Sequence, residues 1–256
     1  MQRASKIISI ANQKGGVGKT TTAINCAAYL AKNGHKILLV DLDPQGNSSS
    51  GLSIDKHSLK LTIYDVLVNN VDVKDVIVKS TMNNLDILPA NSTLAAAEIE
   101  MSGVKARESA LKKALTELEY EIIIIDCPPS LGLLTINSFT ASDYVMIPVQ
   151  SEYYALEGLS ELLNTIKRVR VGLNTRLELL GVVVTMHNKR TSLGEQVVAE
   201  LKKHFPAKMF DTIVPRNIRL AEAPSHGKPI SEYDKYSKGS QSYKKLAREI
   251  EKRLYI

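Results

Sequence analysis

Apolar residues along this chain follow two different spacings. Short runs of aliphatic and β-branched residues alternate with longer segments in which apolar residues recur at helical spacing. This alternation predicts βαβ units, and therefore a doubly wound α/β fold with a mostly parallel sheet flanked by helices. The predicted strands are residues 7–11, 37–40, 85–88, 122–125, 144–149, 179–185 and 212–214.

One predicted strand marks the place of a functional carboxylate. Residues 122–125 are all isoleucine, so this strand is apolar on both faces and is expected in the middle of the sheet. Asp126 follows it directly. Because open α/β sheets bind ligands at the carboxyl ends of their strands, we expect Asp126 to lie in a binding site.

Two helices are predicted at opposite ends of the chain. The first covers residues 20–33, and the last covers residues 241–254 with an apolar stripe on one side and basic residues on the other. The last pattern fits a helix that docks on the core, and it also fits a basic membrane anchor. The segment 224–239 is rich in Pro, Gly, Ser and Lys and is predicted to be a surface loop.

The composition is that of a globular protein with a large core. The chain has 256 residues, of which 44% are hydrophobic and 23% charged, so one domain spanning residues 1–256 is expected. No run approaches the roughly 20 apolar residues of a membrane-spanning helix. The first residues also lack a signal-peptide pattern, so a cytoplasmic location is expected.

Cysteines and histidines do not predict a metal site. Cys26 and Cys127 lie far apart without metal-ligand spacing, and we expect buried, reduced thiols. The histidines show neither ligand spacing nor a nucleophile partner. All of them are predicted to be surface or loop residues: His35, His57, His187, His204 and His226.

The charge balance permits an acidic partner such as nucleic acid. The formal net charge is +6 and the pI is about 9.1. Aromatic residues make up only 5% of the chain and tryptophan is absent. A surface that grips the phosphate backbone is therefore favoured over one that stacks on exposed bases.

The strongest functional signal lies between the first strand and the first helix. It reads Lys14-Gly15-Gly16-Val17-Gly18-Lys19-Thr20. Glycines let successive backbone N–H groups form an anion cradle, and the following helix directs its positive end at the same point. Lys19 is then expected to reach the terminal phosphates and Thr20 to hold Mg²⁺, which predicts a P-loop nucleotide site.

Two further acids follow the second predicted strand. Asp41 and Asp43 stand within Val40-Asp41-Leu42-Asp43-Pro44-Gln45-Gly46-Asn47. A carboxylate pair placed just after a strand can orient Mg²⁺ or an attacking water from a movable loop. Together with Asp126, these acids indicate a metal–nucleotide site, because phosphoryl transfer depends mainly on positioning and charge neutralisation.

The phosphate loop departs from the ordinary pattern in a specific way. Gln13 stands where that pattern has glycine, and Lys14 adds a lysine at the mouth of the loop. This deviant form resembles the family that contains ParA, MinD, the nitrogenase iron protein and the arsenite-pump ATPase. The resemblance implies that Lys14 reaches across a dimer to the partner's nucleotide. It also implies that Asp43 positions the attacking water, that Asp41 supports the metal site and that Asp126 holds Mg²⁺ through water.

The rest of the chain resembles one branch of that family, the chromosomal ParA or Soj proteins. The resemblance covers nearly the whole length, including Ala11-Asn12-Gln13 and the segment 214–229. It implies that Pro215 and Asn217 line the adenine pocket and that Arg190 and Arg219 contact DNA. As a whole it implies nucleotide contacts from Lys14, Gly15, Gly16, Val17, Gly18, Lys19, Thr20, Thr21, Pro215 and Asn217, with Lys14, Lys19 and Asp43 in catalysis and Thr20, Asp41 and Asp126 at the metal.

The resemblance also implies a function. The expected protein binds ATP and Mg²⁺, forms a homodimer with ATP, and in that state binds double-stranded DNA without sequence preference on the nucleoid. A ParB-like partner would accelerate its weak ATP hydrolysis, and repeated cycles would partition a chromosome or a plasmid. The alternative is a MinD-like positioning ATPase whose last helix grips lipid. An iron protein is disfavoured because no convincing cysteine pair exists, and a tyrosine kinase because the tyrosines are too scattered.

Overall fold

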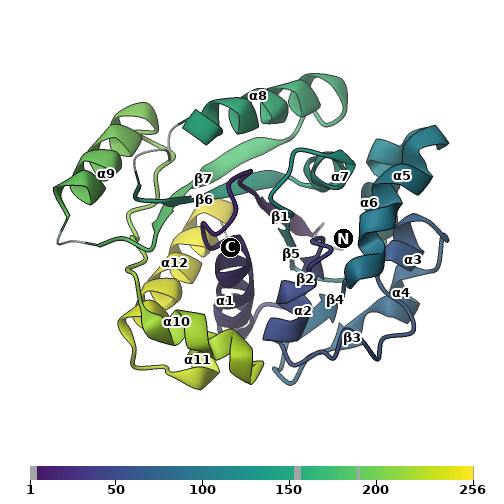
Figure 1. Ribbon diagram of the computed structural model, residues 1–256, viewed down its shortest axis with the longest axis horizontal. Coiled ribbons are helices and arrows are strands. Elements are labelled where there is room, and N and C mark those ends of the chain that lie inside the picture. The colour runs from purple at the N-terminus through teal and green to yellow at the C-terminus, as the bar shows by residue number, and fades with distance from the viewer. Residues whose placement is uncertain (1–4, 153–156, 189–190, 256) are drawn as a thin grey trace.

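The computed structural model describes residues 5–152, 157–188 and 191–255, which form a twisted sheet with helices on both faces (Figure 1). The described residues contribute seven strands in the order β3-β4-β2-β5-β1-β6-β7. All neighbouring strands are parallel except β3 and β4. This confirms the predicted doubly wound, mostly parallel α/β fold. The strands are β1 Lys6–Ile10, β2 Ile37–Asp41, β3 Val78–Lys79, β4 Leu85–Leu88, β5 Ile122–Asp126, β6 Tyr144–Gln150 and β7 Glu178–Thr185.

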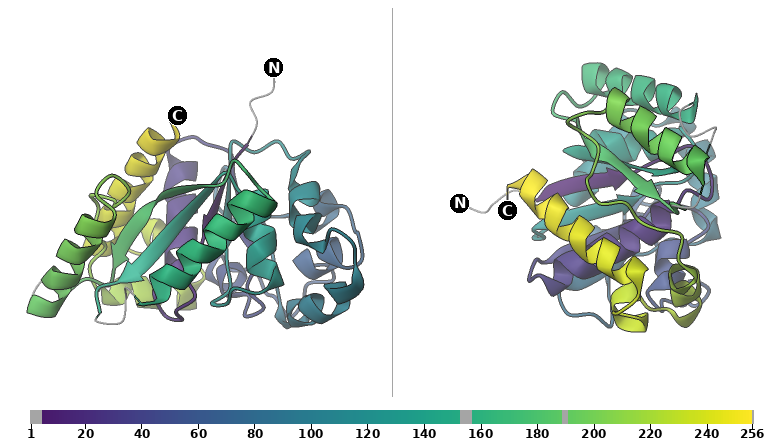
Figure 2. Two further views of the ribbon diagram at one scale, coloured as in Figure 1. Left: turned by 90° about the horizontal axis from the view of Figure 1, so that it is seen from above. Right: turned by 90° about the vertical axis from the view of Figure 1, so that its left-hand side faces the viewer.

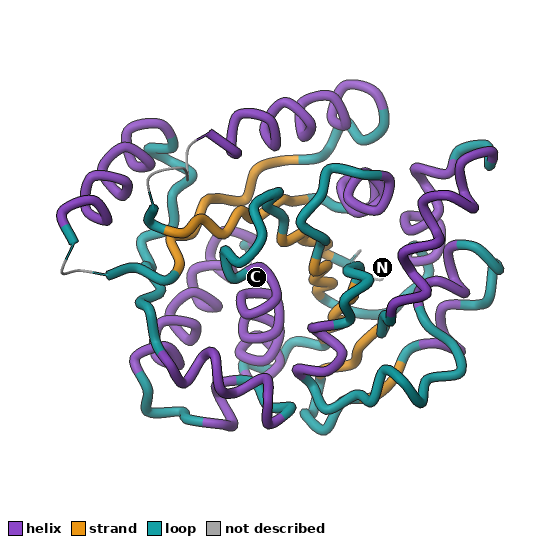
Figure 3. The backbone as a smooth tube through the Cα atoms, in the orientation of Figure 1, coloured by secondary structure: helices purple, strands orange, loops and turns teal. Residues whose placement is uncertain are grey.

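Helices connect the strands and cover both faces of the sheet, as the ribbon and the tube show (Figures 1 and 3). The α-helices are α1 Lys19–Lys32, α2 Asn47–Gly51, α3 Ile63–Leu67, α4 Val73–Val76, α5 Ala97–Glu100, α6 Ala110–Leu115, α7 Leu133–Ala141, α8 Glu157–Gly172, α9 Ser192–His204, α10 Ile218–Glu222, α11 Ile230–Tyr233 and α12 Lys238–Leu254. The 3₁₀ helices are η1 Ser92–Ala96, η2 Met101–Gly103, η3 Arg107–Ser109 and η5 Ala223–His226.

The central strand β5 shows why the sheet is buried on both sides. Its four isoleucines are fully buried, but successive side chains point to opposite faces. Ile122 and Ile124 join the core beneath α1 and α12, whereas Ile123 and Ile125 join the core beneath α6, α7 and α8. The all-apolar strand predicted from the sequence is therefore a consequence of two cores, one on each face.

The terminal helix α12 lies alongside α1 (Figure 2). Ser237 caps its first turn by accepting a hydrogen bond from the Ser240 backbone N–H. Two polar contacts join the helices, because Tyr243 shares a hydrogen bond with Thr22, and Ser240 shares one with Tyr29. The apolar stripe of α12 is buried in this packing, which confirms the core-docking interpretation. Among the described residues, no helix is long and apolar enough to cross a bilayer.

The structure corrects two predictions of secondary structure. Residues 212–214 are not a strand, because Glu249 of α12 accepts hydrogen bonds from the Asp211 and Thr212 backbone N–H groups. The Val214 N–H donates to the Val184 carbonyl oxygen of β7, and the isolated bridges lie on either side of this segment, at Met209 and Pro215. The segment 224–239 is not simply a surface loop, because it contains η5, α11 and the start of α12. Within it Ile230 is completely buried and donates its backbone N–H to the Asn25 side chain.

Two shorter features also differ from expectation. The two-residue strand β3 was not predicted, because so short an edge strand leaves no periodic signal. His187 was predicted to lie at the surface or in a loop, but it is only 4% exposed and stands just after β7. Cys26 and Cys127 are both buried free thiols, as predicted. Burial raises the pKa of the Cys127 thiol to about 12 and that of Cys26 even further.

Candidate nucleotide site

The loop between β1 and α1 has the backbone geometry of an anion cradle. Gly16 and Gly18 have φ angles of 74° and 85°, in the left-handed region that favours glycine. Gly18 is the N-cap of α1, so the positive end of that helix opens into the loop. The Thr185 hydroxyl donates a 2.8 Å hydrogen bond to the Val17 carbonyl oxygen, which anchors the loop to the end of β7.

The two lysines of this loop occupy different environments. Lys19 is 7% exposed, and its ammonium group donates to the Lys14 carbonyl oxygen at 3.2 Å. Burial lowers the pKa of Lys19, and the charge of Asp126 opposes that shift. The side chain of Lys14 is instead 38% exposed at the mouth of the loop. The loop therefore holds one cation inside and presents another outwards.

Asp41 and Asp126 meet at the carboxyl ends of β2 and β5, where they are paired in register. Both side chains are fully buried, and burial is the main cause that raises the pKa of each carboxyl group. The charge of Asp126 raises the pKa of Asp41 further. In contrast, the nearby hydroxyl groups of Thr20 and Ser48 lower the pKa of Asp126.

The short helix α2 supplies hydroxyl groups to both acids. The Ser48 hydroxyl donates to Asp126 Oδ2 at 2.8 Å, and the backbone N–H and hydroxyl of Ser49 both donate to Asp41 Oδ2 at 2.8 Å. Sequence reasoning missed these serines. The signal that could have found them is the run Ser48-Ser49-Ser50 directly after the loop that carries Asp43.

The arrangement fits a divalent cation held by few protein groups. Asp126 Oδ1 is buried without a hydrogen-bond partner among the described residues. The same residues contain no cluster of three or more His, Cys, Asp or Glu side chains that could hold a metal by themselves. Magnesium commonly binds through one or two protein ligands, waters and substrate phosphates, so Thr20 and Asp126 suit it better than a complete protein cage would.

Asp43 lies in a tight turn between β2 and α2. Its Oδ1 accepts a 2.9 Å hydrogen bond from the Gln45 backbone N–H, and its side chain is buried at the rim of the acid pair. Gly46 closes the turn with φ 62°, and a Cβ atom there would lie 2.7 Å from the Ala90 carbonyl oxygen. The turn thus requires glycine and fixes Asp43 near the two strand-end acids.

A mostly apolar cavity adjoins the phosphate loop. Its volume is about 370 Å³, which falls in the range of small-molecule pockets. Pro215 and Asn217 line it, and so do Gly18 and Thr21 of the loop and first helix. The remaining lining residues are Thr185, Met186, Val214, Arg216, Ile218, Leu220, Ala221 and Tyr243. The adenine role of Pro215 and Asn217 stays a prediction.

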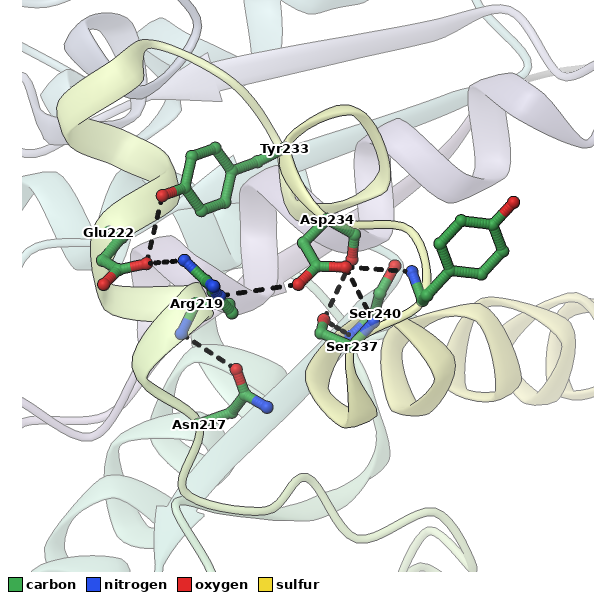
Figure 4. Close-up of polar contacts among 8 residues, drawn as sticks. Asn217, Arg219, Glu222, Tyr233, Asp234, Ser237 and Ser240 are labelled. Atoms are coloured by element: carbon green, nitrogen blue, oxygen red, sulfur yellow. Dashed lines mark hydrogen bonds and ion pairs between the residues drawn. The ribbon is translucent and has the colours of Figure 1, made fainter.

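Arg219, on α10, is not a free cation (Figure 4). Its Nη1 donates to Glu222 Oε2 at 2.9 Å, and its Nε lies 3.6 Å from Asp234 Oδ2. The Tyr233 hydroxyl donates to the same Glu222 oxygen. Asn217, which lines the cavity, caps α10 by accepting a hydrogen bond from the Arg219 backbone N–H. Arg190 lies outside the described residues.

Comparisons with known proteins agree with this geometry. A family model described as an AAA domain matches residues 5–179. The chain is 57% identical to the sporulation initiation inhibitor protein Soj of Bacillus subtilis over 247 residues, which cover 96% of this chain and 98% of that protein. It is 49% identical to the chromosome partitioning protein ParA of Caulobacter vibrioides over 249 residues, 96% of this chain and 93% of that protein.

A solved structure adds information on ligands. Cobyrinic acid a,c-diamide synthase from Mycobacterium smegmatis, solved with bound ADP and magnesium, superposes with a TM-score of 0.84 at 34% identity, over 95% of this chain and 93% of that one. The fold, the glycine cradle and the strand-end acids define a P-loop nucleotide-binding protein of the ATPase class. Within that class, the chain belongs to the ParA/Soj family of chromosome-partitioning ATPases.

Proposed function

We propose that the whole chain acts as one ATPase domain, which dimerises with ATP and Mg²⁺, binds duplex DNA without sequence preference, and partitions a chromosome or plasmid with a ParB-like partner. The observation that carries this proposal is that two lysines of one loop lie in different environments. Lys19 lies inside its own cradle, while Lys14 stands half-exposed at the mouth, where a second subunit could approach. One lysine then serves its own nucleotide and the other serves the partner's.

The residues of the site suggest how hydrolysis would be controlled. The cradle and Lys19 would hold the terminal phosphates, and Thr20 and Asp126 would hold Mg²⁺, which supplies neutralisation of phosphate charge when bound. Asp41 would act as a support, because both of its oxygens already accept hydrogen bonds from neighbouring groups. Asp43 would orient the attacking water. The cavity beside Pro215 and Asn217 would take the base.

Dimerisation would switch DNA binding on by doubling the number of phosphate contacts. Each phosphate that a protein neutralises contributes about 0.9 to the slope of log affinity against log salt. A single subunit offers few contacts and holds weakly, whereas a dimer offers twice as many. Arg219 and Arg190 would contribute contacts, and the ATP-bound dimer would reside on the nucleoid in the bacterial cytoplasm.

The MinD-like alternative is less well supported by the position of α12. The apolar residues of that helix pack against α1 and the sheet rather than facing outwards: Tyr243, Leu246, Ala247, Ile250 and Leu254 are all buried. Lipid binding by this face would require the helix to leave the core. Liposome flotation with ATP tests the point, and retention by lipid without retention by DNA would reverse the choice.

The test of the proposal measures two steps separately. Sedimentation with a non-hydrolysable ATP analogue and magnesium should show a dimer, and Lys14→Ala should remain a single subunit while still binding nucleotide. Binding to duplex DNA should be tight and salt-dependent with ATP, and weak with ADP or without nucleotide. Single subunits at all concentrations, or equal DNA binding in all three states, would overturn the proposal.

A further inference from the structure

The exposed lysine of the phosphate loop is paired with an acid of its own chain. Lys14 Nζ lies 3.3 Å from Glu152 Oε2, and the two side chains are 38% and 51% exposed. Glu152 follows β6, which is adjacent to β1 in the sheet, so the pair joins the ends of two neighbouring strands. The backbone N–H of Lys14 is fixed as well, because it donates to Asn12 Oδ1 at 3.0 Å.

The carboxylate of Glu152 is held in place. Its Oε1 accepts a 2.6 Å hydrogen bond from the Gln150 amide, and its backbone N–H donates to the Gln150 carbonyl oxygen at 2.8 Å. Its neighbour Ser151 shares a 3.3 Å hydrogen bond with the buried His187 ring, whose other nitrogen lies 3.2 Å from Glu195. Glu152 is therefore presented to Lys14 by a turn that is tied to the end of β7.

A second acid near the same loop makes a different contact. Glu161, on α8, accepts a 3.0 Å hydrogen bond from the neutral amide of Gln13, one residue before Lys14. Both acids are exposed, and each contacts a residue at the mouth of the loop. They differ in that Glu152 neutralises the lysine itself, which makes Glu161 a matched control for the effect of charge alone.

We propose that Glu152 is a positioning residue that pairs with Lys14 in the single subunit, so that the partner's nucleotide must replace the Glu152 carboxylate in order to contact the lysine. This inference rests on the proposed function, in which Lys14 contacts the nucleotide of a second subunit. A triphosphate carries several negative charges and Glu152 carries one, so the exchange favours the nucleotide once the subunits meet. Until then, Lys14 is neutralised and offers little attraction to other anions.

The proposal predicts the effect of removing this one charge. Glu152→Gln keeps an oxygen for the Gln150 amide and abolishes the ion pair. An exposed ion pair changes an equilibrium by roughly a factor of two, and two pairs open in each dimer, so the dimer dissociation constant with a non-hydrolysable ATP analogue should fall about fourfold. Glu161→Gln should leave that constant unchanged.

A second measurement tests the contact without dimerisation. The rate at which an amine-specific reagent labels Lys14 in the nucleotide-free protein is read by peptide mass spectrometry. Glu152→Gln should label about twice as fast as the wild type, because the ion pair is worth roughly a factor of two. Glu161→Gln should label at the wild-type rate, and a lysine away from the loop, Lys60, serves as the internal standard.

The outcomes separate this inference from the proposed function. Faster labelling together with tighter dimerisation of Glu152→Gln supports it. Equal labelling of all three proteins, or faster labelling with an unchanged dimer constant, overturns it, as does an equal gain in Glu161→Gln. If the wild type and Glu152→Gln both stay single with the analogue although Glu152→Gln labels faster, the proposed function fails while the ion pair stands.

Discussion

Asp41 and Asp126 occupy paired positions on neighbouring parallel strands, and each is the last residue of its strand. Both are fully buried, and Asp126 Oδ1 has no hydrogen-bond partner among the residues that the structure describes. Two buried carboxyl groups this close favour a shared proton or a bound cation over two free charges. The electrostatic repulsion between these two carboxylates is therefore unfavourable in the empty site, and a magnesium–nucleotide complex would relieve it.

Replacement of Asp126 by asparagine should stabilise the empty protein and weaken its response to magnesium. The change removes a buried charge while keeping an acceptor for the Ser48 hydroxyl. We expect the melting temperature of the nucleotide-free protein to rise by roughly 2–4 °C, as a gain of about 1 kcal/mol implies at this chain length. Thermal unfolding with an ATP analogue, with and without Mg²⁺, should show little of the wild type's magnesium-dependent stabilisation.

The control for this variant is Asp86→Asn on β4. Asp86 is also a strand carboxylate, but its partner is the Tyr120 hydroxyl, at 2.8 Å. It should leave the response to magnesium unchanged. A full magnesium response in Asp126→Asn would remove that residue from the metal site.

Arg219 and its carboxylate partner should have opposite effects on DNA binding. Arg219→Ala should lower the affinity of the ATP-bound dimer and reduce the salt slope by about 1.8, which is 0.9 for one phosphate contact in each subunit. Glu222→Gln should raise the affinity about twofold to fivefold, because it removes the closer of the two carboxylates that pair with the guanidinium, and with it a negative charge near the phosphate. Fluorescence anisotropy with a duplex across a salt series measures both quantities.

An exposed acid on the neighbouring helix provides the comparison for Glu222. Glu232 lies on α11, outside the cluster drawn in Figure 4. Glu232→Gln removes the same charge from the same region without releasing Arg219. Equal gains from Glu222→Gln and Glu232→Gln would show that net charge, and not the Arg219 pair, sets the affinity.

The buried thiol of Cys26 predicts a loss of stability in alkali. Burial raises its pKa in the folded state, so the unfolded chain loses this proton at a lower pH than the folded chain does. The thiol's contribution to the free energy of unfolding is constant below the ordinary thiol pKa of about 8.5. Above that pH it becomes destabilising, by up to about 1.4 kcal/mol per pH unit. Denaturant unfolding should be measured between roughly pH 7.5 and 9.5, about one unit to either side of the ordinary thiol pKa. The free energy of unfolding should decline less steeply with pH for Cys26→Ala than for the wild type. Parallel curves would mean that the thiol ionises in the folded protein.

The elements that the sequence predicted well are those with a local signal. The all-isoleucine strand before Asp126 and the stripe of α12 repeat at the period of their secondary structure, so their burial could be inferred. The glycines of the phosphate loop likewise reveal their backbone geometry. These signals predicted the fold and placed Lys19 and Asp126 together.

The contacts that the sequence did not reveal join residues far apart in the chain. Ser48 reaches Asp126 and Glu152 reaches Lys14 only after the sheet brings strand ends together. His187 shows the same difficulty, because a polar residue after a strand is usually exposed, and only the packing of α9 and the Ser151 turn buries it. Side-chain partners of this kind depend on the tertiary structure and leave no periodic pattern.

Substitutions at Asp43 separate a catalytic role from a structural one. Its Oδ1 accepts the Gln45 backbone N–H and so holds the turn before α2. Asp43→Ala removes both the charge and this hydrogen bond, whereas Asp43→Asn keeps an acceptor for Gln45 and removes only the charge. If Asp43 orients the attacking water, both variants should still form the ATP-dependent dimer, and turnover should fall by about 10²–10⁴-fold.

The comparison of the two variants decides the role of Asp43. The lost hydrogen bond costs about 1 kcal/mol, so Asp43→Ala should also melt slightly lower, while Asp43→Asn should melt near the wild type. Asp55→Asn, an exposed acid beyond α2, should leave turnover and melting unchanged. Phosphate release measured beside sedimentation separates hydrolysis from dimerisation. Wild-type turnover in Asp43→Asn would mean that the turn, and not the carboxylate charge, is what the reaction requires.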